Sequence, residues 1–299
     1  MTVVEIVVSH PSLLGECPLW SPTEGLLYWI DIEGRQIHRY DPTTGRNETQ
    51  GVSARPGSIA LTDEPGVLLV AMEHELVWFR WQTGELKSFV ALEPEGNGNR
   101  LNDGRTDPAG RFVVGSMWSN PGDGRSTGSL YSVEGDGAFN VVRTTIGVTN
   151  GLAFDPIREW AYFADTFTKK VIRWNYDVEA ARRSNEIVFC DYQNLPGLPD
   201  GACVDADGCY WSASVYGWSV VRITPDGKID RRIELPLEKP SMPAFGGPKL
   251  DTLFITTIGS EGGRPSKPGK DGAIPGSLVA VDAGVLGLPE TPFAGSPVF

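Results

Sequence analysis

The chain has 299 residues, a formal net charge of -12 at pH 7 and 40% hydrophobic residues, including nine tryptophans. The negative charge argues against nucleic acid or an anionic membrane surface as a partner, because phosphate groups attract a basic face. No linker or charge shift divides the sequence, and its hydrophobic content suffices for a core, so we expect a single domain over residues 1–299.

The first ten residues, MTVVEIVVSH, lack a basic start, and their apolar run is too short for a signal peptide or a membrane span. We therefore expect a cytoplasmic protein that does not enter a membrane. Residues 2–9 are instead a candidate strand whose partner lies elsewhere in the chain.

One short element then recurs six times along the chain. The copies read ECPLWS from Glu16, SIALTD from Ser58, NDGRTDP from Asn102, NGLAFDP from Asn150, DGACVD from Asp200 and MPAFGGP from Met242. The steps between their first residues are 42, 44, 48, 50 and 42 residues. Self-similarity at this period is typical of a β-propeller, in which each repeat forms one four-stranded blade.

The remainder of each repeat reads as further strands. A turn signal such as DPAG or DADG comes first, and an alternating apolar segment follows: LLYWID, VLLVAM, RFVVGSM, WAYFAD, CYWSAS and TLFITT. A third segment such as IHRYD or VIRWNY comes next. Period-2 apolarity between Gly and Asp turns is typical of strands buried between blades, and no long helical pattern competes with it. The sequence therefore predicts an all-β, six-bladed β-propeller.

The last repeat is short of a strand. It supplies TLFITT and SLVAVD and then trails off in VLGLPETPFAGSPVF. We expect residues 2–9 to pair with this repeat, so that N- and C-terminal strands close the ring and remove an open edge. Residues 260–276, rich in Gly, Pro and Lys, should form an inserted loop. A closed ring can be a stable monomer, but the sequence does not indicate the oligomeric state.

The sequence offers little for nucleophilic catalysis. None of the three histidines, His10, His38 and His74, is near a GxSxG elbow, which argues against a Ser-His-Asp triad. The cysteines form no CxxC pair, and a domain of this size does not need disulfides. We expect buried free thiols at Cys17, Cys190, Cys203 and Cys209.

Four of the six copies begin with an oxygen-bearing side chain at one register: Glu16, Asn102, Asn150 and Asp200. The first strand of each blade lines the axis of a propeller, so these side chains should converge there. Two carboxylates and two amides suit calcium, magnesium or manganese and, less well, zinc or ferrous iron. The alternative for each position is an Asx turn that bonds its own backbone. We assign that role to the aspartates ending the element: Asp63, Asp107, Asp155 and Asp205.

Several blocks in combination resemble the regucalcin and gluconolactonase family of sugar-lactone hydrolases. They are GECPLW from Gly15, NRLNDGRTDPAGRF from Asn99, TNGLAFDP from Thr149, LPDGACVDADG from Leu198 and AFGGP from Ala244, and they span nearly the whole chain. The resemblance implies a six-bladed propeller with one divalent metal ion in its central channel. It also implies that the metal ligands are Glu16, Asn150 and Asp200, with Asp200 as the catalytic acid and base as well.

The same resemblance implies a substrate site beside the metal. Arg100 and Asn102 match the substrate-contacting pair of the family, and Asn102 could bind either the metal or a sugar hydroxyl. Asn120 stands where animal members have a substrate-contacting Glu, and this departure leaves the identity of the sugar open. Trp118 is a candidate wall for the sugar, with packing between blades as the alternative.

The expected reaction is the metal-dependent hydrolysis of a small sugar lactone, a γ- or δ-aldonolactone, to the aldonic acid. The metal would polarise the carbonyl, and Asp200 would activate the attacking water. Two other functions stay open: a propeller hydrolase that cleaves aryl lactones or organophosphates, and a non-enzymatic calcium-binding regulatory protein. Calcium binding as the sole role would leave the Arg-x-Asn pair without a purpose.

Overall fold

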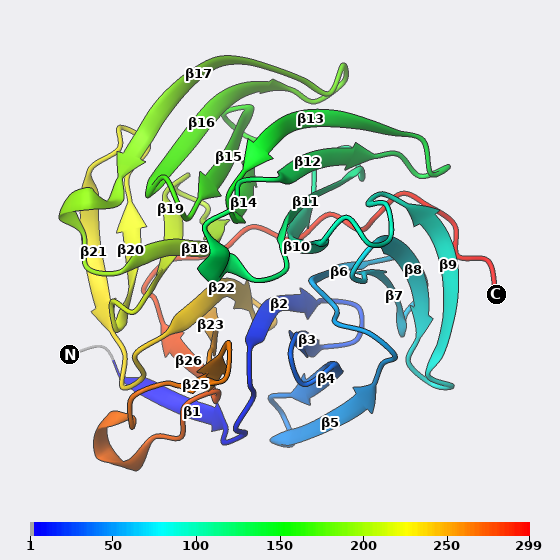
Figure 1. Ribbon diagram of the computed structural model, residues 1–299. Coiled ribbons are helices and arrows are strands. Elements are labelled where there is room, and N and C mark those ends of the chain that lie inside the picture. Colours follow the sequence, from blue (N-terminus) through cyan, green and yellow to red (C-terminus); the bar gives the residue numbers. More distant parts are fainter. Residues whose placement is uncertain (1–2) are drawn as a thin grey trace.

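The computed structural model describes residues 3–299, which form six four-stranded antiparallel sheets arranged in a ring (Figure 1). Met1 and Thr2, the latter the first residue of the predicted terminal strand, lie outside the described residues. Each sheet is one blade, and the innermost strands β2, β6, β10, β14, β18 and β22 gather around the axis (Figure 1). The predicted six-bladed propeller is confirmed.

The first three blades are built in chain order from the axis outward. Blade 1 contains β2 (Gly15–Ser21), β3 (Leu26–Asp31), β4 (Gln36–Asp41) and β5 (Arg46–Gly51). Blade 2 contains β6 (Ser58–Leu61), β7 (Val67–Ala71), β8 (Glu75–Arg80) and β9 (Glu85–Ala91). Blade 3 contains β10 (Asn99–Thr106), β11 (Phe112–Trp118), β12 (Gly128–Val133) and β13 (Phe139–Ile146).

The other three blades continue around the ring. Blade 4 contains β14 (Thr149–Asp155), β15 (Trp160–Asp165), β16 (Lys170–Asp177) and β17 (Arg182–Asp191). Blade 5 contains β18 (Leu198–Val204), β19 (Tyr210–Val215), β20 (Ser219–Ile223) and β21 (Ile229–Glu234). Blade 6 contains β22 (Pro240–Gly246), β23 (Thr252–Thr257), β26 (Leu278–Asp282) and, outermost, β1 (Val4–Val8).

The pairing of β1 with β26 closes the ring, as predicted. The two strands are antiparallel, with Val4 opposite Val281 and Ile6 opposite Val279. The N-terminal strand thus supplies the fourth strand that the last repeat lacks, and it covers an edge that would otherwise expose unpaired backbone groups.

The predicted inserted loop contains a small hairpin, β24 (Ser260–Glu261) with β25 (Arg264–Pro265). The helical segments of the described residues are 3-10 turns, η1 (Pro121–Asp123), η2 (Tyr192–Asn194) and η3 (Lys270–Gly272). Within residues 3–299 no helix has the length and apolarity needed to cross a membrane.

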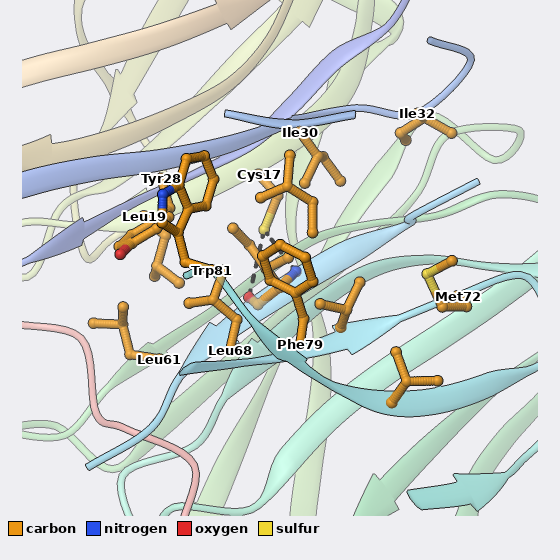
Figure 2. Close-up of a cluster of buried hydrophobic side chains, with 14 of the residues drawn as sticks. Cys17, Leu19, Tyr28, Ile30, Ile32, Leu61, Leu68, Met72, Phe79 and Trp81 are labelled. Atoms are coloured by element: carbon orange, nitrogen blue, oxygen red, sulfur yellow. Dashed lines mark hydrogen bonds between the residues drawn. The ribbon is translucent and has the colours of Figure 1, made fainter. Parts of the chain in front are cut away.

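Apolar side chains of neighbouring blades pack face to face. Figure 2 shows the cluster between blades 1 and 2, where Tyr28, Leu68 and Phe79 are almost fully buried. The thiol of Cys17 lies within it, and Sγ accepts a hydrogen bond from the Ile59 amide at 3.3 Å. All four cysteines are buried and free, as predicted.

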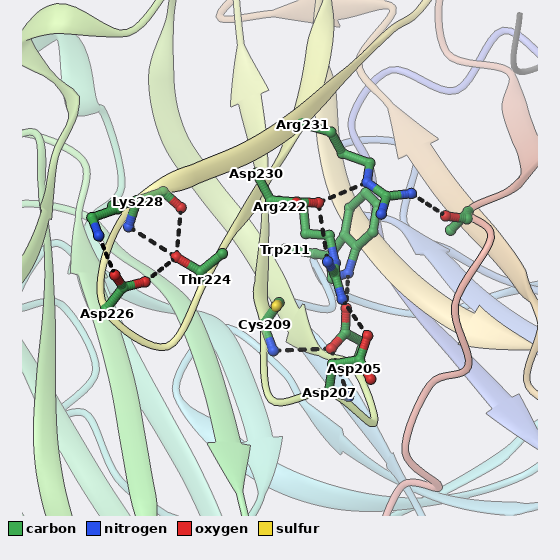
Figure 3. Close-up of polar contacts among 11 residues, drawn as sticks. Asp205, Asp207, Cys209, Trp211, Arg222, Thr224, Asp226, Lys228, Asp230 and Arg231 are labelled. Carbon is green, nitrogen blue, oxygen red and sulfur yellow. Dashed lines mark hydrogen bonds and ion pairs between the residues drawn. The ribbon is translucent and has the colours of Figure 1, made fainter.

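Three of the four aspartates that end the repeated element bond their own turns, as predicted, whereas at Asp63 it is the preceding Thr62 that accepts the hydrogen bond of the turn amide, from Glu64 N at 3.2 Å. Asp107, Asp155 and Asp205 each accept hydrogen bonds from two backbone amides that follow, at 2.9 to 3.0 Å. The second oxygen of Asp205 accepts from Trp211 Nε1 and from Arg222 Nε, both at 2.8 Å (Figure 3). These two hydrogen bonds tie the end of β18 to β19 and β20 within blade 5.

Replacing Asp205 by alanine should therefore destabilise the fold by about 1 to 3 kcal/mol for each buried donor that it leaves unpaired, Trp211 Nε1 and Arg222 Nε. The other nitrogens of the guanidinium stay bound to Asp207 and Asp230. Chemical denaturation of both proteins measures this difference. The matched control is Asp226→Ala, which removes an exposed carboxylate paired with Lys228 in the same blade (Figure 3). The control should hardly change the unfolding midpoint, because exposed ion pairs add little to stability. Equal effects of the two substitutions would contradict the scaffold role of Asp205.

The antiparallel order gives the ring two distinct faces. The innermost strands all start at one face, where the connections between blades and the turns between second and third strands also lie. We call this the entrance face. At the opposite face the C-terminal segment crosses behind the ring (Figure 1), with Gly287 bridged to Asp205 and Phe293 N bonded to Leu61 O at 2.8 Å.

Candidate functional site

Irregular pairing marks the start of the innermost strands. Register shifts follow Glu16 in β2, Leu101 in β10, Asn150 in β14 and Pro199 in β18. A β-bulge re-aims side chains that regular alternation would send into the sheet face. Glu16, Asn102, Asn150 and Asp200 all occur at these shifts, so the sequence repeat corresponds to a repeated bulge near the axis. β22 also has a shift, but it presents the apolar Met242.

The bulges require unusual backbone geometry next to two of these residues. Cys17, after Glu16, has φ of 48°, and Gly151, after Asn150, has φ of 61°. A Cβ on Gly151 would lie 2.4 Å from Tyr210 Oη and 3.3 Å from the carbonyl oxygen of Asp200. Glycine is therefore required there, because it alone permits β14 and β18 to approach so closely.

A chain of hydrogen bonds links the side chains of blades 3, 4 and 5. Arg100 Nη1 donates to Asn102 Oδ1 at 2.7 Å, and Asn102 Nδ2 donates to Thr149 O at 2.9 Å. Asn150 Nδ2 donates to Thr166 Oγ1 at 2.8 Å, and Thr166 Oγ1 donates to Pro199 O at 2.9 Å. The chain holds Asn102 and Asn150 in fixed orientations and ends at the residue before Asp200.

Three carboxyl groups influence one another near the axis. Burial, followed by the charge of Asp103, raises the pKa of Glu16 to about 8. Burial, followed by the charges of Glu16 and Glu261, raises the pKa of Asp200 well above its usual value. Burial also raises the pKa of Asp103 to about 6, against the hydrogen bond from the Leu152 amide. Carboxylates in this setting are stabilised by a positive partner.

The donor atoms of Glu16, Asn150 and Asp200 fit a hard divalent cation. Asn150 uses its Nδ2 for Thr166, which leaves the amide oxygen without a hydrogen bond in the described residues. Glu16 uses only Oε2, for the Cys17 amide at 3.0 Å. Two carboxylates and one amide oxygen are ligands that calcium, magnesium and manganese accept. Residues 3–299 contain no cluster of three His, Cys, Asp or Glu side chains placed to hold a metal.

Arg100 lies beside these groups with an unused hydrogen-bond donor. The residue is 5% exposed, and its Nε has no hydrogen-bond partner within the described residues. Burial, followed by the nearby charge of Arg55, lowers the pKa of Arg100 to about 10. Arg55 is itself bound to Glu73 at 2.6 Å and to Glu33 at 3.3 Å. Arg100 is thus a buried cation with a free donor next to the axis.

Trp118 and Asn120 lie at the rim of the entrance face. Trp118 ends β11, and its Nε1 donates to Asp123 at 2.9 Å, while the Arg125 guanidinium lies 4.1 Å from its ring centre. The exposed Asn120 side chain also donates to Asp123, at 2.9 Å. Both predicted substrate residues are therefore held by the surface turn that contains Asp123.

Two charged residues near the axis were missed in the sequence. Asp103 lies in the bulge of β10, and regular alternation would have turned it away from Asn102. Arg105 is buried, donates to Ala202 O at 2.6 Å and forms an ion pair with Glu290 of the C-terminal segment. For Asp103, only the Asn-Asp doublet before Gly104 could have indicated a role near the axis. For Arg105, the neighbouring sequence gives no indication, because its partner Glu290 is 185 residues away in the chain.

Comparison with known proteins gives consistent results. A family model described as "SMP-30/Gluconolactonase/LRE-like region" matches residues 14–259. A 6-deoxy-6-sulfogluconolactonase of Pseudomonas putida is 38% identical, with 98% of this chain and 99% of that protein aligned. Pentonolactonase XacC of Haloferax volcanii is 37% identical, with 97% of each chain aligned. A crystal structure of a calcium-binding protein, regucalcin, from Agrobacterium tumefaciens superposes with a TM-score of 0.89 at 26% identity, covering 98% of this chain and 97% of that one.

Proposed function

Because the chain belongs to the SMP-30/gluconolactonase/LRE-like family, we propose that it hydrolyses a sugar lactone to the aldonic acid with the help of one divalent cation. The observation that supports this most is that Glu16 lies close enough to Asp200 and to the buried Arg100 for its charge to act on both, while Asn150 occupies the same bulge position in β14. The named lactonases among its relatives support the same reaction class. A protein that only stored cations would not need a buried arginine next to the ligands.

Glu16, Asn150 and Asp200 would hold the cation, and Asn102 would not. Both polar atoms of the Asn102 side chain are engaged, one by Arg100 and one by the Thr149 carbonyl. When bound, the cation supplies a Lewis acid that polarises the lactone carbonyl and stabilises charge on its oxygen. Calcium, magnesium, manganese, zinc and ferrous iron all accept such ligands, with the first three favoured by an all-oxygen set.

Asp200 is proposed as the acid and base. Its carboxylate accepts a proton from the attacking water, whose oxygen bonds to the acyl carbon. The bond between the acyl carbon and the ring oxygen then breaks, and the same proton passes from Asp200 to the departing ring oxygen. The products are a carboxylic acid and an alcohol on one chain, and no further reactant is needed.

Arg100 and Asn102 orient the substrate. The Arg100 guanidinium is the proposed donor to a sugar hydroxyl or ring oxygen, and Asn102 fixes the position of Nη1 through a bond of 2.7 Å. A planar guanidinium with one anchored nitrogen loses little freedom when it binds a ligand.

This proposal is tested by initial hydrolysis rates on a panel of γ- and δ-aldonolactones. An aryl lactone and a fluorophosphonate serve as alternative substrates. We expect at least one pentono- or hexonolactone to be opened well above its spontaneous rate and faster than either alternative substrate. Faster hydrolysis of the aryl lactone would contradict the sugar specificity and favour a propeller hydrolase that cleaves aryl lactones. No turnover of any compound, despite cation binding, would favour a regulatory calcium-binding protein.

A further inference from the structure

A second polar cluster lies on the entrance face, across the ring from Arg100. It consists of Tyr216, Lys239 and Glu261, which we call the Lys239 cluster. Tyr216 belongs to the turn after β19, Lys239 to the connection that leads into β22, and Glu261 to β24. These elements are in blades 5 and 6, whereas Arg100 is in blade 3. Blades 3 and 6 face each other across the axis of a six-bladed ring.

The contacts among these three side chains leave a carboxylate oxygen and an ammonium group without hydrogen-bond partners in the described residues. Tyr216 Oη donates to Glu261 Oε2 at 2.6 Å, which leaves Oε1 free of hydrogen bonds among the described residues. The Lys239 ammonium lies 3.7 Å from Glu261 Oε2 and 4.8 Å from the Tyr216 ring centre. Lys239 is 4% exposed, and within residues 3–299 its ammonium makes no hydrogen bond. A lysine so deeply buried normally has its donors satisfied.

The cluster lies close to Asp200. Tyr216 follows Val215 of β19, whose partner in β18 is Leu198, two residues before Asp200. The charge of Glu261 also acts on the Asp200 carboxyl, after that of Glu16. The inserted segment that carries Glu261 is anchored to the connection between blades 5 and 6, since Lys267 pairs with the buried Glu238 at 2.7 Å and Lys270 N bonds Pro236 O at 2.8 Å. Glu261 is thus held in place on the entrance face, where it contacts Tyr216 and Lys239. It also lies two residues beyond residues 14–259, the segment that the family model matches.

We propose that the Lys239 cluster binds the hydroxylated tail of a neutral aldonolactone whose carbonyl end faces Asp200 and Arg100. This inference rests on the proposed lactonase function and names its substrate class. A hydroxyl both donates and accepts hydrogen bonds, so it can bridge an ammonium and a carboxylate that lie side by side. A sulfonate, phosphate or carboxylate on the tail would be attracted by the Lys239 ammonium but repelled by the Glu261 carboxylate beside it.

The charges of the whole entrance face agree with a neutral tail. Near the axis lie five acidic side chains, Glu16, Asp103, Asp200, Glu261 and Glu290, against three basic ones, Arg100, Arg105 and Lys239, and Arg105 and Glu290 pair with each other. A divalent cation would neutralise the difference and leave no surplus of positive charge for an anionic tail. The Pseudomonas putida relative acts on a sulfonated gluconolactone according to its name, so the two proteins should differ at this end of the substrate.

The test compares kcat/KM for a neutral aldonolactone and for the same lactone with a phosphate on its terminal hydroxyl. Wild-type protein should prefer the neutral compound by at least about tenfold. Glu261→Gln removes the repelling charge, so the preference should fall by about tenfold or more. Tyr216→Phe, at a half-exposed position where folding is retained, should raise KM for the neutral lactone. The control Glu64→Gln removes an exposed carboxylate paired with Arg80 on the opposite face and should leave the ratio unchanged.

The outcomes separate the two proposals. If the wild-type protein opens aldonolactones but prefers the phosphorylated one, or if Glu261→Gln leaves the ratio unchanged, the role of the Lys239 cluster is wrong while the lactonase function stands. If no aldonolactone of either kind is opened, the proposed function itself fails. A Glu261→Gln protein with an unchanged melting curve and a shifted ratio supports the inference.

Discussion

Replacing Asp200 by asparagine should reduce kcat/KM for the best aldonolactone by about 10³-fold, because a positioned acid and base contributes about 10² to 10⁴ in rate. Asparagine keeps the size of the side chain and one oxygen for the cation, but its amide cannot accept a proton from water. The loss should fall mainly on kcat. Continuous titration of the acid released from the lactone measures it directly.

Two controls distinguish this loss from a disturbed fold. The melting curve of Asp200→Asn should remain cooperative, and added cation should still raise its midpoint, although less than for the wild-type protein. Arg100→Met removes the orienting donor instead of the base, so it should raise KM while cation binding is retained. If both variants hydrolyse the lactone as fast as the wild-type protein does, the site is elsewhere.

The arrangement of the blades was predictable from the sequence because each blade repeats one pattern. The six copies of the repeated element, four of which begin with Glu16, Asn102, Asn150 or Asp200, already indicated six strands around an axis. The closure by β1 was predictable for a related reason: the last repeat had too few strands, and the N-terminal strand had no other partner. The turn aspartates followed from Asx chemistry, which depends only on neighbours in the chain.

The chemistry around the axis was less predictable, because it depends on contacts between distant segments. The Asn102 amide could have faced a metal or a sugar, and only its bonds to Arg100 and to the Thr149 carbonyl show that both ends are in use. Lys239 is an ordinary lysine in the sequence, and its burial beside Glu261 depends on the position of the inserted segment. Periodicity places side chains near the axis, but bulges and inserted segments decide which of them meet.

Removal of divalent cations should abolish lactone hydrolysis and lower the melting temperature of the protein. The charge of Glu16 raises the pKa of Asp200, and the charge of Asp103 raises the pKa of Glu16, so a cation beside these carboxyls would relieve repulsion as well as bind substrate. Restoring a cation at about 100 times its dissociation constant should stabilise the fold by about 2.7 kcal/mol. Thermal melts of the stripped protein, with each divalent cation added in turn, measure this gain without relying on activity.

Glu16→Gln provides the decisive comparison. It keeps an oxygen at the site and relieves the repulsion from Asp200 without any cation, so the stripped variant should be at least as stable as the stripped wild-type protein. Added cation should then stabilise it far less, because one of two charged ligands is missing. Equal cation-induced shifts in the two proteins would place the cation elsewhere, and full activity after stripping would remove the cation from the reaction. Either result would leave Asp200 and Arg100 to be explained as a cation-free hydrolytic pair, which the Asp200→Asn and Arg100→Met rates test independently.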